Sequence, residues 1–224
     1  SLATGAVTVS TLTTVGTGSI QFDQTGGQTL TMTKATTVDG PITITNDGNT
    51  LTAVTVTAAD AGNDATWDVI LTTTTSGDIL IGSVTADNQA TITAAGAIQA
   101  NATDAGADVT AGIIDLNAAT GIGTGAFGAL DITGATITAD STTGNVDIDS
   151  LATADVTVTT LTTGTGAIQF DQTSTGGPWT LNVATATTAD GAITITNAAD
   201  DLTVGTVTAG GAGANVTLTT SGVA

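Results

Sequence analysis

The chain repeats itself at an offset of about 149 residues. Residues 20–25 return unchanged as residues 168–173, and residues 42–46 return as residues 193–197. Residues 1–149 therefore make one complete copy, and residues 150–224 repeat the first half of it. Self-similarity of this kind is the sequence signature of repeat architectures. We expect one continuous solenoid that is a piece of a longer repetitive polypeptide.

The apolar residues suit a thin interior. Only three Phe and two Trp occur among 224 residues, and Tyr is absent, although globular cores normally depend on aromatic rings for buried area. The apolar content instead comes from Val, Ile, Leu and Ala, which pack well between closely spaced sheets. A narrow, layered core of this kind is typical of a solenoid.

Apolar residues alternate with Thr or Asp at a period of two, as in residues 42–45, 54–57, 146–149 and 216–219. This alternation predicts half-buried strands and an all-β chain. A Gly precedes many of these strands by one or two residues, at intervals of roughly 20 to 40 residues, which is one or two coils of a parallel β-helix. The sequence therefore predicts a β-solenoid rod of about nine to eleven coils, uncapped at both ends.

Tandem immunoglobulin-like sandwiches are the alternative, since 149 residues could hold one or two of them. The missing core aromatics oppose this arrangement. Trp67 and Trp179 also occupy non-equivalent places in the two copies, so neither is a shared core anchor.

The segments Gly-Ala-Ile-Gln at 96–99 and 166–169, Gly-Asp-Ile-Leu-Ile at 77–81, and the Thr-rich strands resemble the repeat regions of filamentous-haemagglutinin-type adhesins and other giant bacterial surface proteins. The resemblance covers the whole chain and is compositional. It implies an exported right-handed parallel β-helix that serves as a stalk or fibre at the cell surface or outside the cell. Its partners would be further repeats of the same chain and other copies, joined end to end or laterally.

Charge excludes some partners. The formal net charge is −19, every acid is Asp, and Lys34 is the only cation. Phosphate backbones would be repelled by such a surface, so we expect no nucleic-acid binding. No apolar run reaches the length of a membrane span, and the absence of Cys rules out thiolate metal sites.

Residue types also argue against catalysis. Without His or Cys, a Ser or Thr nucleophile lacks its customary base. Glycoside cleavage needs only two carboxylates, and Asp147 and Asp149 would lie about 7 Å apart on one face of a strand. A solvated strand face is the favoured explanation of this pair, and we expect no enzyme, no catalytic residue and no cofactor.

Calcium is the candidate metal, because hard cations take several oxygen ligands. The candidate ligands lie in turns: Asp47, Asn49, Asp60, Asp64, Asp200 and Asp201. Residues 210–216 also resemble one copy of a calcium-binding nonapeptide, with Asn215 where that motif has Asp. Ordinary turns closed by Asp and Asn side chains are the alternative interpretation.

Thr-x-Thr pairs recur, and a regular array of them on one flat face would suit ice binding. The pairs are Thr43/Thr45, Thr55/Thr57, Thr91/Thr93, Thr157/Thr159, Thr194/Thr196 and Thr217/Thr219. Thr is also simply a good strand former. The sequence thus favours a structural component of a fibre or adhesin stalk, with a calcium-binding or ice-binding solenoid as the alternative.

Overall fold

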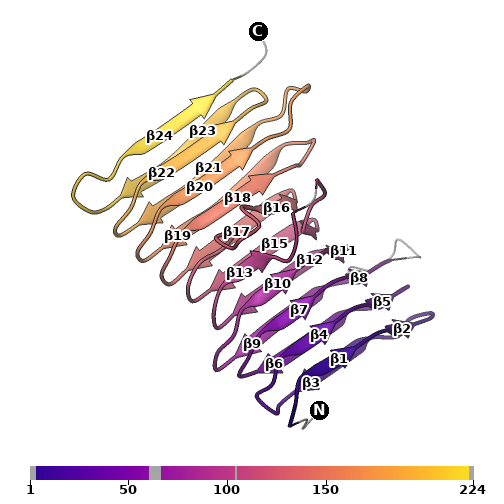
Figure 1. The fold of residues 1–224 in the computed structure, drawn as a ribbon. Helices are drawn as coiled ribbons and strands as arrows, with labels where there is room; N and C mark the ends of the chain where they lie inside the picture. The colour runs from indigo at the N-terminus through magenta and orange to yellow at the C-terminus, as the bar shows by residue number, and fades with distance from the viewer. Residues whose placement is uncertain (1–3, 61–66, 104, 222–224) are drawn as a thin grey trace.

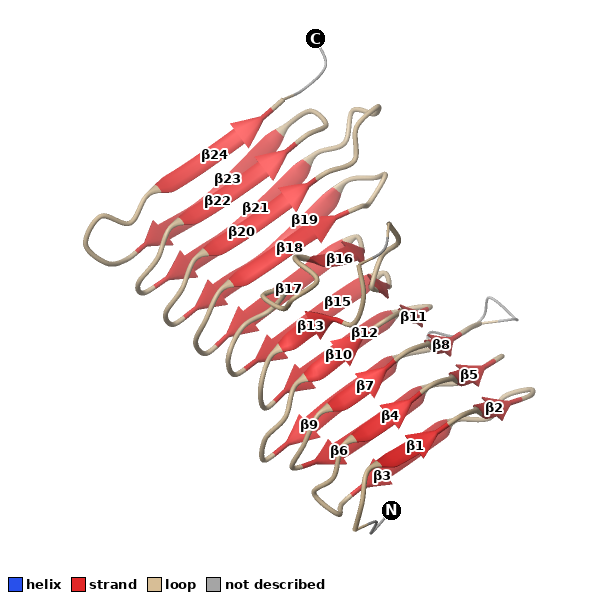
Figure 2. Cartoon of the chain, viewed as in Figure 1, coloured by secondary structure: helices blue, strands red, loops and turns tan. Residues whose placement is uncertain are grey.

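The computed structural model describes residues 4–60, 67–103 and 105–221, and the chain winds through them as a parallel β-solenoid of about nine coils (Figure 1). The described residues contain strands and loops and no helix (Figure 2). Every pairing between the named strands is parallel, which immunoglobulin-like sandwiches, with antiparallel sheets, do not allow. The predicted solenoid is therefore confirmed, and the sandwich alternative is wrong.

Two faces enclose the core, and we call them face A and face B. Face A contains two sheets. The first has the order β1 (Val7–Val9), β4 (Leu30–Met32), β7 (Leu51–Ala53), β10 (Ile79–Ile81), β13 (Ile98–Ala100). The second has the order β2 (Leu12–Thr14), β5 (Ala35–Thr37), β8 (Val56–Ala58), β11 (Val84–Ala86), β14 (Val109–Thr110), β16 (Leu130–Thr133), β18 (Val146–Ser150), β20 (Ile168–Gln172), β22 (Ile193–Asn197), β24 (Val216–Thr220).

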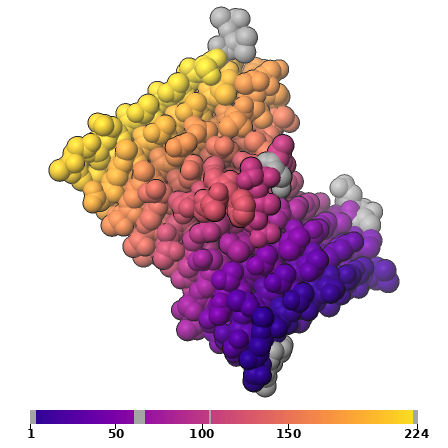
Figure 3. All heavy atoms as spheres, viewed as in Figure 1, coloured from indigo at the N-terminus to yellow at the C-terminus, as the bar shows by residue number. Residues whose placement is uncertain are grey.

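Face B is a single nine-stranded sheet, and it covers the opposite side of the core. Its order is β3 (Ile20–Gln24), β6 (Ile42–Asp47), β9 (Val69–Thr74), β12 (Gln89–Ala94), β15 (Ile113–Ala118), β17 (Thr136–Ser141), β19 (Val156–Thr163), β21 (Leu181–Thr188), β23 (Leu202–Ala209). The coils fill a continuous elongated body from one end to the other (Figure 3).

Inward side chains stack in columns, because the strands pair in register at about 4.8 Å per coil. One column on face A has ten stacked positions, all occupied by Val, Leu or Ile. Its members are Val7, Leu30, Leu51, Ile79, Ile98, Ile122, Val146, Ile168, Ile193 and Val216. Phe170 is the largest fully buried side chain. This interior has the narrow aliphatic character that the composition predicts.

The glycines that precede the strands also stack, and their lack of a side chain is what lets the coils close. A Cβ on Gly40 would lie 2.3 Å from the carbonyl oxygen of Gly18, and a Cβ on Gly191 would lie 2.0 Å from that of Gly166. Any other residue would collide with the coil below. Steric exclusion at the corner therefore explains why Gly recurs along the sequence.

Polar side chains enter the interior where a strand meets its turn. Gln24 and the adjacent Asn46 on face B are fully buried. The amide of Asn46 donates to the carbonyl oxygens of Asn49 (2.8 Å) and Thr50 (3.0 Å), and Gln24 accepts from the Gly26 amide (2.7 Å). Buried amides thus hold the turn by hydrogen bonds to its backbone.

The two copies of the repeat place matched strands on opposite faces. β3 and β20 share the sequence Ile-Gln-Phe-Asp-Gln, yet β3 belongs to face B and β20 to face A. From β1 to β19, which open the two copies, the chain passes between the faces thirteen times. Since one coil contains two passages, the repeat spans six and a half coils. The second copy is therefore turned by half a revolution about the rod axis.

A β-bulge allows this exchange on face B. The straight β17 pairs with the longer β19, and the register shifts between Ile137 and Thr138, opposite the extra residue Thr159. The Thr159 hydroxyl donates to the Ile137 carbonyl oxygen (3.1 Å) and lies 2.6 Å from the Thr138 hydroxyl. Its counterpart in the first copy is Ser10, between β1 and β2. The bulge thus lets the eight-residue strand β19 pair with the six-residue strand β17.

Candidate binding surfaces

Outward side chains form columns of their own, because in-register pairing stacks equivalent positions. One column on face A consists of six threonines in consecutive coils. They are Thr13, Thr36, Thr57, Thr85, Thr110 and Thr133. Their hydroxyl and methyl groups repeat at about 4.8 Å along the rod.

The predicted Thr-x-Thr pairs do not share one face, because three of the six lie on strands of face B. Thr43/Thr45 and Thr91/Thr93 lie on face B, where β9 separates them and places Ile70 in the same column. Thr194/Thr196 and Thr217/Thr219 lie on adjacent strands of face A. The half-coil offset of the repeat distributes the pairs over both sides of the rod. The six-membered column could be found only once the coil boundaries were known.

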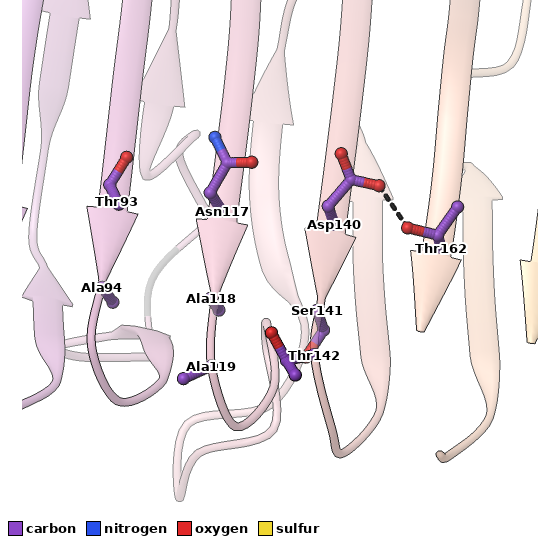
Figure 4. Close-up of a pocket in the computed structure, with 9 residues that line it drawn as sticks. All are labelled: Thr93, Ala94, Asn117, Ala118, Ala119, Asp140, Ser141, Thr142 and Thr162. Atoms are coloured by element: carbon purple, nitrogen blue, oxygen red, sulfur yellow. Dashed lines mark hydrogen bonds between the residues drawn. The ribbon is translucent and has the colours of Figure 1, made fainter. Parts of the chain in front are cut away.

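Face B carries a mixed polar column beside a hollow of about 390 Å³. Figure 4 shows Thr93, Asn117, Asp140 and Thr162 on four neighbouring strands. The Thr162 hydroxyl donates to a carboxylate oxygen of Asp140. Small side chains, including Ala118, are also among the residues that line the hollow. This surface presents hydroxyl, amide and carboxylate groups in one line.

Three carboxylates stack on face A, with Asp131, Asp149 and Asp171 at paired positions of β16, β18 and β20. Burial, followed by the charges of Asp171, Asp131 and Asp147, raises the pKa of Asp149 to about 6. Burial, followed by the charge of Asp171, also raises the pKa of Asp147. The column therefore concentrates negative charge at a partly buried place.

The neighbouring loops form a small cavity of about 140 Å³ over this column, lined by Asp108, Asp131, Asp149 and Phe127 among others. Asp108 is only 3% exposed, and its carboxylate accepts a hydrogen bond from the backbone amide of Asp131 (3.0 Å). Alternation on one strand makes Asp147 and Asp149 visible in the sequence. Asp108, Asp131 and Asp171 were not predicted, because only the lengths of the coils bring them to this place.

The candidate calcium ligands lie in separate turns. The Asp47 carboxylate accepts hydrogen bonds from the hydroxyls of Thr75 (2.7 Å) and Thr74 (2.9 Å), which lower its pKa. The side chain of Asn49 accepts from the Thr50 amide (2.9 Å). Asp47 is the last residue of β6, and Asn49 lies in the turn that follows it. Asp60 follows β8 and forms a backbone bridge with Asp39.

Asp200 and Asp201 follow β22, six and a half coils further along the rod, so they do not meet Asp47. Their carbonyl oxygens accept hydrogen bonds, from the Thr220 hydroxyl at Asp200 and from the Asn197 amide at Asp201 (2.8 Å). Asp64 lies outside the described residues. Within the described ranges, no group of three or more acidic residues is arranged to hold a metal ion. Calcium binding by these turns stays a prediction.

Comparison with known families, with curated proteins and with solved structures finds no match. Within residues 4–60, 67–103 and 105–221, no helix is long and apolar enough to cross a membrane.

Proposed function

We propose that this chain is a structural component of an extracellular or cell-surface fibre, a stalk of the adhesin type in which stacked coils act as spacer and scaffold. The observation that carries the proposal is the continuity of the ladders. The aliphatic column on face A has ten stacked positions without a break. Each coil rests on its neighbours in the same register, as rod-like solenoids require.

Residue chemistry supports a mechanical role. The sequence contains no His, Cys or Arg, so most nucleophilic and acid-base machinery has no residues to build it. Asp149 and Asp147 lie on the outward face of β18, where both carboxylates are partly buried. A high negative charge keeps such rods apart at low ionic strength.

Electron microscopy of the native material tests this proposal. We expect long thin fibres whose power spectrum has a layer line near 4.8 Å along the fibre axis. Isolated compact particles, or beads separated by linkers, would contradict the structural role.

Ice binding is the second candidate, and the column of six threonines on face A favours it. Regular hydroxyl and methyl groups on a flat, rigid sheet could order water at a fixed spacing. Thermal hysteresis of the purified chain tests this function. Thr57→Lys and Thr85→Lys, in the middle of the column, should abolish hysteresis, whereas Thr203→Lys on face B should not. Absence of hysteresis in the unmodified chain would exclude this function.

Calcium binding by the turns is a further candidate function. If the folded chain binds calcium, its melting temperature should rise with added calcium and fall with a chelator. Magnesium at the same concentration separates specific binding from general screening of the negative charge.

A further inference from the structure

One outward column crosses the strands of face B, and it changes residue type at the hollow. Its members in order along the rod are Asp23, Thr45, Thr72, Thr93, Asn117, Asp140, Thr162, Thr187 and Thr208. Between Thr45 and Thr208, only Asn117 and Asp140 are not threonine. These two residues lie on the adjacent strands β15 and β17, and both line the hollow. The threonine column is therefore replaced by an amide and a carboxylate where the surface is hollowed.

Asn117 and Asp140 each present one unpaired acceptor oxygen. The side-chain amide of Asn117 donates to the Asp115 carboxylate (2.9 Å), and its carbonyl oxygen points toward Asp140 (Figure 4). One Asp140 oxygen accepts from the Thr162 hydroxyl. Within the described ranges, neither the second Asp140 oxygen nor the Asn117 carbonyl oxygen receives a hydrogen bond from the protein. Two acceptors on strands about 4.8 Å apart are thus open to a donor from outside the chain.

Exposed hydroxyl groups stand beside these acceptors. Thr93 on β12 and Thr142, in the turn after β17, also line the hollow and are exposed. In the part of the chain that the structure describes, neither hydroxyl hydrogen-bonds to another protein group. A hydroxyl both donates and accepts hydrogen bonds. A ligand that pairs with the whole set must therefore itself carry both donors and acceptors.

The chemistry of the lining excludes several classes of ligand. The hollow is lined by Thr, Ser, Asn, Asp and Ala residues, so it lacks the aromatic and large aliphatic side chains of an apolar site. Asp140, with Asp115 next to it, would repel an anion, and Lys34, the only cation of the chain, lies between β4 and β5 on face A. The ligand that remains is polar and not negatively charged.

A metal ion fits this lining poorly. Calcium takes six to eight oxygen ligands, several of them usually carboxylates. Asp140 supplies the single carboxylate among the lining residues, and the described ranges contain no group of three acidic residues arranged to hold a metal ion. A volume of about 390 Å³ also far exceeds the size of one ion and falls within the range of small-molecule sites.

The hollow is elongated along the rod. Its lining comes from β12, β15, β17 and β19, and three strand spacings of about 4.8 Å make a length of about 14 Å. Beyond the hollow the column continues as Thr72 on one side and Thr187 on the other. Hydroxyl groups therefore extend the same polar line in both directions, which suits a chain-like ligand.

We propose that the hollow on face B binds a neutral, hydroxyl-rich ligand, a short oligosaccharide lying along the rod axis. Its hydroxyls donate to the Asn117 carbonyl oxygen and to the unpaired Asp140 oxygen. The hydroxyls of Thr93 and Thr142 donate to its oxygens. This site goes beyond the structural role of the rod and does not depend on fibre formation.

Nuclear magnetic resonance titration of the isotope-labelled chain tests the site with three neutral probes: cellohexaose, maltohexaose and laminarihexaose. The readout is the backbone amide signals of Ala118, in the lining, and the amide signal of the Asn117 side chain. The test variant is Asn117→Thr with Asp140→Thr, which completes the column with a good strand former. The matched control is Gln169→Thr with Asp171→Thr on β20, an outward amide and carboxylate on face A. Circular dichroism checks that both variants fold.

We expect at least one neutral hexasaccharide to shift these signals in a saturable way. The test variant should bind at least about tenfold more weakly, because it loses hydrogen bonds to a charged and an amide acceptor, and the control should bind as the unmodified chain does. Ala119→Leu, which fills the hollow and leaves the column intact, should weaken binding as well.

Three results would overturn the proposal. The first is that none of the three hexasaccharides binds. The second is that only spermidine or calcium shifts the signals, which would make the hollow a cation site. The third is equal affinity in the unmodified chain, the test variant and Ala119→Leu, which would place binding elsewhere. Fibres with a layer line near 4.8 Å are expected whatever the titration shows, so its failure leaves the proposed structural role standing.

Discussion

Phe22 and Phe170 occupy the same place in the sequence repeat and lie on opposite faces of the solenoid. Both are the central residue of an Ile-Gln-Phe-Asp-Gln strand with the side chain turned inward. Phe170 is fully buried between neighbouring coils, whereas Phe22 lies in an edge coil and is partly exposed. Identical local sequence thus produces the same strand in two environments, which allows burial to be tested at constant sequence.

Phe170→Ala should destabilise the chain by about 3–5 kcal/mol, because it removes a buried ring and leaves a cavity between coils that cannot collapse. Phe22→Ala should cost clearly less, since solvent already reaches that ring. Urea unfolding followed by circular dichroism measures both changes. Equal losses for the two variants would contradict the burial difference and the stacking that causes it.

Thr159→Val should weaken the bulge at which β19 becomes a long strand. The valine keeps the branched shape but removes the hydroxyl that donates to the Ile137 carbonyl oxygen (3.1 Å). A cost of about 1 kcal/mol is expected for a lost hydrogen bond of this kind. Thr159→Ser is the matched control, because the first copy has Ser10 at this position and a serine retains the hydroxyl. Comparable unfolding midpoints for the two variants would show that the hydroxyl does not support the bulge.

Stability should depend on pH through Asp149. Its pKa is raised from an ordinary value of 3.8 to about 6 in the folded chain, so the folded chain holds this proton after the unfolded chain has lost it. Stability therefore falls as pH rises from about 4 to about 6, and this contribution is constant at higher pH. Asp149→Asn should make the melting temperature fall less steeply across that window, and Asp147, whose pKa burial also raises, accounts for the slope that is left.

Asp47→Asn is the control for this pH dependence. Hydrogen bonds from Thr75 and Thr74 lower the pKa of Asp47, so its contribution to stability is lost only at pH values below 3.8. The Asp47 variant should therefore keep the unmodified slope between pH 4 and 6. A flat profile in the unmodified chain would contradict the assignment to Asp149.

The fold could be predicted from sequence because its rules are local. Alternation of apolar and polar residues identifies the strands, and the glycines before Ile42 and Ile193 mark corners where no side chain fits. What could not be predicted is which face each strand joins. The bulge at Thr159 occurs in a segment that differs from its first-copy counterpart by only Thr159 for Ser10, so nothing in those residues reveals the half-coil offset.

Surface columns depend on that offset and were therefore the least predictable feature. Asp149 and Asp147 were visible as a pair on one strand. Their neighbours Asp131 and Asp171 are 18 and 22 residues from Asp149, and only the coil lengths bring them into register with it. Coil length is set by loop insertions such as residues 123–129, for which the repeated strands provide no signal.

Gly191→Ala tests the close approach of the coils at their corners. The backbone of Gly191 has no positive φ, so the substitution introduces no conformational strain of its own. The added Cβ would lie 2.0 Å from the Gly166 carbonyl oxygen, so two coils must separate locally or shift. Overpacking of this kind costs about 1–3 kcal/mol. Gly5→Ala is the control, because no atom lies within 4 Å of its Cβ position. Urea unfolding should show a loss for Gly191→Ala and none for Gly5→Ala. An unchanged midpoint for Gly191→Ala would mean that the corner has more room than the stacked glycines indicate.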